Sequence, residues 1–115
     1  MNAAAADHPD FCVTIGDDFS VDALRTVTAE AVEQIYRSQR RFLGLVGHSA
    51  PVFLVNGNHE QAAMCDMDGT PNNVAVWAQN ARNRFFPQPA PDGFYTGDMG
   101  TVEFIGPLRD YYAWT

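Results

Sequence analysis

The sequence predicts an α/β domain built on one parallel βαβ unit, and three observations support this prediction. Two short segments, residues 10–16 and 51–56, are apolar and rich in β-branched and aromatic side chains, as buried strands are. The stretch between them, residues 20–46, carries apolar residues at helical spacings of three and four. Each apolar segment also stops at a glycine, Gly16 or Gly57, where the chain can turn sharply.

The first predicted strand, residues 10–16, has an apolar set of side chains on one side and Cys12 and Thr14 on the other. The apolar set is Phe11, Val13 and Ile15. Neither side carries a charge within these positions, so we expect the strand to be covered on both faces, as strands of parallel sheets are.

An amphipathic helix is predicted over residues 20–46. Ser20 is a favoured N-cap residue, and Asp22 suits the positive end of the helix dipole. Glycines weaken the carboxyl end of this stretch, so residues 42–46 are expected to form a short separate piece. One face of the helix is apolar: Val21, Leu24, Val27, Ala31 and Ile35.

The second half of the chain predicts one more helix and some short strands. Thr70 and Pro71 are typical of an N-cap followed by the first helical position, so we expect a helix over residues 71–85. Residues 93–100 are interpreted as a loop or hairpin tip, with short strands at 102–105 and 111–114. Trp77 and Phe85 are expected to pack in the core or between helices. Four further aromatic residues are expected to pack in a core or an interface, with the lining of a substrate mouth as the alternative: Tyr95, Tyr111, Tyr112 and Trp114.

Length and composition favour one domain. The chain has 115 residues, a net charge of −7 and two cysteines, Cys12 and Cys65. The negative charge argues against nucleic acid or an anionic membrane as the main partner, because both attract basic surfaces. Two cysteines make no disulfide framework. No apolar run reaches membrane-spanning length and no signal peptide is recognisable, so we expect this chain to be cytoplasmic.

The predicted topology brings distant polar residues together. Parallel strands direct their carboxyl ends to the same edge of a sheet, where α/β proteins bind their ligands. Asp17 and Asn58 follow the two strands directly, and His59 comes next. A carboxylate, a carboxamide and an imidazole are therefore expected to converge, and these groups bind divalent metals. The alternatives are a helix-cap or turn carboxylate at Asp17, an Asx-turn at Asn58 and a solvated loop histidine at His59.

Two motifs at these turns resemble those of a known family. Gly16-Asp17-Asp18 and Gly57-Asn58-His59-Glu60 resemble the second and third motifs of the calcineurin-like metallophosphoesterases, which include the purple acid phosphatases. The wider stretch, residues 11–97, is similar to bacterial members of this superfamily. The resemblance implies part of an αββα sandwich built on the βαβ unit.

The resemblance also implies roles for individual residues. Asp17 would be the carboxylate that bridges two divalent metal ions (Fe, Zn, Mn or Mg), and Asn58 would bind one of them through its carbonyl oxygen. His59 would be the catalytic residue that protonates the leaving oxygen, while a metal-bridging hydroxide attacks phosphorus in a small phosphoester. Glu60 is expected to fix the loop by hydrogen bonds rather than to bind metal.

The sequence departs from the family pattern at most of the other metal ligands. No Asp-x-His motif precedes Asp17, and no histidine follows His59; Gly47-His48 precedes the third motif instead of following it. Residues 1–115 are therefore interpreted as a single partial metallophosphoesterase domain. The missing ligands would come from a second copy or from unusual residues such as His48, Asp98 or Glu103.

Two functional hypotheses follow from these observations. The first is a metal-dependent phosphoester hydrolase, a phosphatase or phosphodiesterase. The second is a catalytically incomplete fragment that folds or self-assembles without turnover. A partial domain exposes sheet edges and apolar faces, so we also expect the chain to form a homo-oligomer.

Overall fold

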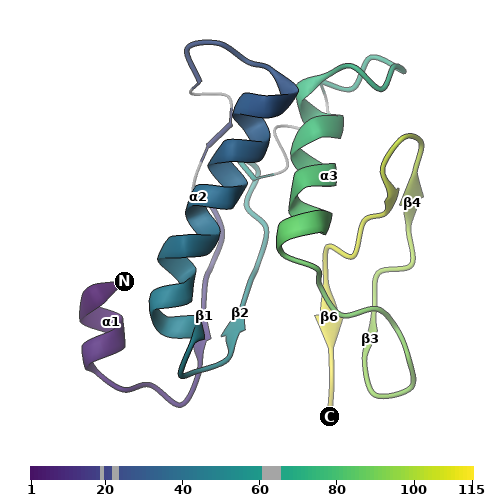
Figure 1. Ribbon diagram of the computed structural model, residues 1–115. Coiled ribbons are helices and arrows are strands. Elements are labelled where there is room, and N and C mark those ends of the chain that lie inside the picture. The colour runs from purple at the N-terminus through teal and green to yellow at the C-terminus, as the bar shows by residue number, and fades with distance from the viewer. Residues whose placement is uncertain (19, 22–23, 61–65) are drawn as a thin grey trace.

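The computed structural model shows a mixed α/β domain (Figure 1) and describes residues 1–18, 20–21, 24–60 and 66–115. Within these residues there are three helices and three two-stranded sheets. The helices are α1 (Asn2–Ala6), α2 (Ala29–Gly47) and α3 (Val74–Phe85). The strands are β1 (Cys12–Val13), β2 (Val52–Phe53), β3 (Thr96–Gly97), β4 (Thr101–Val102), β5 (Gly106–Pro107) and β6 (Tyr112–Ala113).

The predicted parallel βαβ unit is confirmed. β1 pairs in parallel with β2, with Cys12 opposite Val52, and α2 connects the two strands. The amide of Cys12 donates to the carbonyl of Pro51 at 2.9 Å, and that of Thr14 donates to the carbonyl of Phe53 at 2.9 Å. Each observed strand has two residues and is shorter than predicted. The hydrogen bonds made by Pro51 and Thr14 extend the pairing one residue beyond these strands.

The two main helices begin later than predicted. α2 starts after Thr28, whose hydroxyl oxygen accepts the amide of Ala31 at 3.2 Å, and Ser20 lies outside the helix. Asp22 lies outside the described residues. Residues 42–46 belong to α2 without a break. The free energy that an isolated glycine costs in a helix is smaller than the free energy that the packing of the helix provides.

α3 also begins at a different cap from the predicted one. Its N-cap is Asn73, whose Oδ1 accepts the amide of Val76 at 3.1 Å. Thr70 instead forms part of a turn, in which its amide and hydroxyl both donate to Asp68 Oδ1. Both residues are good caps, and the packing of α3 against α2 decides where the helix begins.

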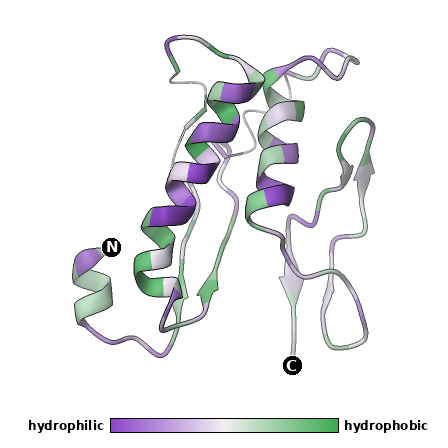
Figure 2. Cartoon of the chain, viewed as in Figure 1, coloured by the Kyte–Doolittle hydropathy of each residue, from purple (hydrophilic) through white to green (hydrophobic). Residues whose placement is uncertain are grey.

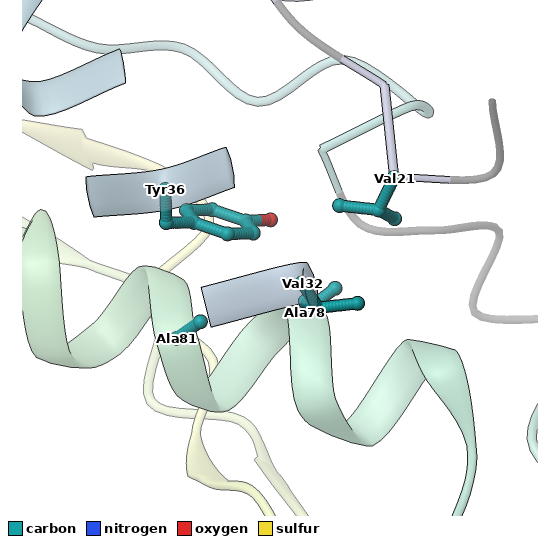
Figure 3. Packing of buried hydrophobic residues seen from close by; sticks show 5 residues of the cluster. All are labelled: Val21, Val32, Tyr36, Ala78 and Ala81. Atoms are coloured by element: carbon teal, nitrogen blue, oxygen red, sulfur yellow. The ribbon is translucent and has the colours of Figure 1, made fainter. Parts of the chain in front are cut away.

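A small core forms between α2 and α3 (Figure 3). Val32 and Tyr36 of α2 meet Ala78 and Ala81 of α3, and Val21 closes the cluster from the preceding loop. Partly buried residues extend this core, and they include the predicted packing residues Trp77 and Phe85.

The carboxyl-terminal part forms two antiparallel strand pairs beside α3 (Figure 1). β3 pairs with β6, and an aromatic cluster joins this pair to β2. Trp114 stacks on Phe53 with ring centroids 4.9 Å apart, and it also contacts Tyr112 and Tyr95. The expected packing role of these aromatic residues is confirmed except at Tyr111, which is largely exposed.

One prediction about the first strand is wrong. α2 lies along one face of the β1–β2 pair, and Phe11, Val13 and Ile15 on the other face are exposed instead of covered. Figure 2 shows that hydrophobic residues colour both of these strands. The molecule is correspondingly flat, with Cα extents of 43 × 38 × 18 Å. None of the helices in the described ranges has the length and apolarity needed to cross a membrane.

Candidate functional site

The candidate site lies where the chain turns after β1 and β2. Because the two strands are parallel, Asp17 and Asn58 follow them at the same edge. The backbone amide of His59 donates to Asp17 Oδ1 at 3.3 Å, across 42 positions of sequence. The structure therefore brings the two predicted motifs together. Asp17 and Asn58 are exposed, whereas His59 is partly buried.

Glu60 joins the two turns to each other. Its side chain is 4% exposed, and its Oε2 accepts the amides of Asp17 and Gly57, each at 2.8 Å. Its Oε1 accepts the amide of Asp18, and its own backbone carbonyl accepts the hydroxyl of Tyr36 from α2. The prediction that Glu60 fixes the loop by hydrogen bonds is confirmed.

The two glycines of the motifs allow this close approach. Gly16 has a positive φ of 85°, and a Cβ there would lie 2.5 Å from the amide nitrogen of Gly57. A Cβ at Gly57 would lie 2.0 Å from Asp17 Oδ1. Asp17 itself adopts the left-handed region at a φ of 54°, which aspartate tolerates better than most residues. Any larger side chain at either glycine would push the turns apart.

The predicted site residues carry donor groups of the kinds that divalent ions bind. Asp17, Asn58 and His59 offer a carboxylate, a carboxamide oxygen and an imidazole, which are ordinary ligands of such ions. In the part of the chain that the structure describes, however, no three His, Cys, Asp or Glu side chains are grouped to hold a metal ion. These residues alone therefore do not make a two-ion centre.

The residues considered as substitute ligands do not complete the site. His48 caps the carboxyl end of α2 just before β2, so it lies at the opposite end of the βαβ unit from Asn58. Asp98 accepts the amides of Gly100 and Asp110, and thereby stabilises the turn after β3. Glu103 is exposed in the β4–β5 turn.

Behind the turns lies a small cavity of about 20 Å³, roughly the space of one water molecule. Its polar lining includes Asp18, Tyr36, Glu60 and Arg82. Arg82 of α3 is only 3% exposed, and burial lowers the pKa of its guanidinium, although nearby Asp110 and Tyr36 oppose this shift. Burial also raises the pKa of Tyr36.

Sequence reasoning missed Arg82 and Tyr36 as parts of this site. A signal was present, since Arg82 follows Ala78 by four residues and therefore lies on the buried stripe of α3. A charged residue on such a stripe indicates a buried polar network, because an isolated buried charge is costly.

Comparisons with models of protein families, with curated proteins and with solved structures find no match to this chain.

Proposed function

We propose that this chain carries part of the active site of a metal-dependent phosphoester hydrolase, in an αββα type of fold. One observation supports this most: the Gly-Asp and Gly-Asn-His-Glu turns meet at the carboxyl edge of a parallel strand pair. The His59 amide, bonded to Asp17 Oδ1 at 3.3 Å, and the buried Glu60 hold them together.

Each residue would contribute a different chemical group to catalysis. Asp17 and Asn58 supply oxygen ligands for divalent ions of the Fe, Zn, Mn or Mg class. A pair of such ions, when bound, supplies Lewis acidity and a nucleophile at neutral pH. His59 would donate a proton to the leaving oxygen of a small phosphoester, a role in which histidine side chains commonly act as general acids. Further ligands must come from outside Asp17, Asn58 and His59.

The alternative is a protein that folds or self-assembles without turnover. A specific observation favours it: no group of three acidic, histidine or cysteine ligands occurs among the described residues. Two or three side chains hold an ion weakly, since water fills the remaining positions. The two proposals differ in a measurable way, because only the hydrolase requires a metal-dependent rate.

The test is hydrolysis of p-nitrophenyl phosphate and its bis-ester with added Mn, Zn, Fe, Mg or Ni. We expect a metal-dependent rate that His59→Ala lowers by about 100-fold or more, the usual scale for a lost acid catalyst. Asp17→Ala should lower this rate as well, because it removes a metal ligand. His48→Ala is the matched control, because this histidine is exposed at the opposite end of the unit and should leave the rate unchanged. If no metal raises the rate above background, the non-catalytic alternative holds.

A further inference from the structure

Arg82 is a buried charge that the proposed chemistry does not use. It lies in α3 among the buried residues Ala78, Gln79 and Ala81, and it is only 3% exposed. Its Nη1 has no hydrogen-bond acceptor among the described residues. A charge in such a place costs free energy unless other charges compensate it. The role of Arg82 therefore depends on the charged groups near it.

Acidic residues lie close to the guanidinium of Arg82. Among the described residues that line the cavity behind the turns, Arg82 is the basic one, and Asp18 and Glu60 are acidic. Burial lowers the pKa of Arg82, whereas Asp110, Tyr36 and Glu60 raise it, Asp110 the most. Arg82 therefore supplies positive charge to Glu60 and Asp110 at the same time.

These two acids hold the turn after β2 at two points. The carboxylate of Glu60 accepts amides of both turns, including that of Gly57 at 2.8 Å. Asp110 Oδ1 accepts the side-chain amide of Asn56 at 3.1 Å, and Asn56 directly precedes Gly57. The turn is thus bonded to one acid through its main chain and to the other through the side chain just before it.

The three charged residues come from three parts of the chain. Arg82 belongs to α3, Glu60 follows the turn after β2, and Asp110 lies between β5 and β6. A guanidinium is planar and spreads its charge over its nitrogen atoms, so it can attract two acids in different directions. A charge placed between these parts favours one arrangement of them over others.

We propose that Arg82 is a positioning residue for the two turns: its charge holds Glu60 and Asp110 in place, and these acids hold the turns. Without Arg82 the two acids would repel each other in a partly buried place, where charges are weakly screened. The turns would then loosen while the core between α2 and α3 remains. That Arg82 thereby orients metal ligands rests on the proposed hydrolase function, whereas the positioning of the turns does not.

The test is hydrogen–deuterium exchange of backbone amides, followed by NMR on the metal-free chain. Arg82→Met removes the charge and keeps a long apolar side chain on the buried face of α3. We expect the amides of Asp17, Asp18 and Gly57 to exchange about 10-fold faster in this variant, because their bonds to a charged acceptor weaken. The amide of Val46, a buried residue of α2, should keep its exchange rate.

Arg84→Met is the matched control, since Arg84 lies on the same helix but is exposed in a salt bridge with Glu33. It should leave all four amides unchanged. Arg82→Lys should give intermediate rates at the turns alone, because a point charge on a shorter stem attracts two acids less well. This variant provides the same comparison if Arg82→Met does not fold.

Equal acceleration of the turn amides and of Val46 in the Arg82 variants would indicate a general loss of stability and would overturn the proposal. Turn amides that exchange at the parent rate in either Arg82 variant, or that Arg84→Met accelerates equally, would overturn it too. The measurement uses no metal and no substrate, so its result is separate from that of the hydrolase assay.

Discussion

Glu60 shows how one side chain sets the geometry of the candidate site. Its carboxylate accepts three backbone amides, two from the turn after β1 and one from the turn after β2. These amides lack strand partners, since the parallel pairing ends before the turns. Without Glu60 they would be left unsatisfied in a partly buried place, which is costly. The residue therefore positions Asp17 without any need to bind a metal itself.

We predict that Glu60→Ala lowers the free energy of unfolding by about 3 kcal/mol, because three amides lose their acceptor at once. Urea unfolding monitored by circular dichroism measures the change. Glu33→Ala is the control, since Glu33 also bonds two partners, Arg37 and Arg84, but at the surface. Its loss should cost less than about 1 kcal/mol. Equal losses for the two variants would contradict the structural role of Glu60.

Asp18 should make stability depend on pH. Burial raises the pKa of Asp18 above its ordinary value of 3.8, and the carboxylates of Glu60 and Asp17 act in the same direction, although Thr14 opposes them. The ionised form is thus disfavoured by folding, so this group stabilises the fold below pH 3.8 and loses that contribution as the pH rises through the folded pKa. Asp18→Asn should therefore melt at a higher temperature than the parent at pH 7, with no difference below pH 3.8.

Asp68→Asn provides a control of opposite sign for this titration. Hydrogen bonds from Thr70 lower the pKa of Asp68, so its stabilisation is present at neutral pH and lost as the pH falls through the folded pKa. This variant should melt below the parent at pH 7. Thermal melts of both variants between pH 3 and pH 7 measure the two trends. Curves that shift in the same direction would contradict the assignment.

At the scale of elements, the sequence predicted type and order better than boundaries. The spacing of apolar residues and the positions of glycines are local signals, and they correctly indicated β1, α2, β2 and α3 in this order. The predicted starts of α2 and α3 were wrong because several residues near each start can act as caps. Thr28 and Asn73 prevailed over Ser20 and Thr70, since packing between α2 and α3 selects which residues stay helical. Such a choice depends on contacts that local sequence does not contain.

The cap of α3 gives the prediction at this scale. Asn73→Ala should lower the free energy of unfolding by about 1 kcal/mol, the usual cost of losing an N-cap side chain. Asn72→Ala is the matched control, because Asn72 is an exposed neighbour outside the helix. Urea unfolding of both variants separates the two positions. A larger loss at Asn72 would show that the helix begins elsewhere.

At the scale of the whole molecule, the candidate site was more predictable than the surface. The meeting of the two turns follows from parallel pairing, and the hydrogen bond from the His59 backbone amide to Asp17 Oδ1 shows that the turns are in contact. The apolar stripe of α3 indicates that Arg82 is buried, but its place beside Glu60 depends on where α3 docks, which no local pattern specifies. The exposure of Ile15 was unexpected for a similar reason: an apolar strand predicts that something covers it, but does not say whether the cover belongs to the same molecule.

The bonds of Glu60 to main-chain amides have a consequence for protein engineering. Every residue except proline carries such an amide, so the tie places few restrictions on which side chains project from positions 17 and 18. Position 17 has the further requirement of a left-handed backbone, which asparagine and glycine also satisfy. Main-chain atoms hold the two turns together, whereas side-chain atoms carry the reactive groups. Other ligand side chains can therefore be introduced at positions 17 and 18 without changing the hydrogen bonds of Glu60.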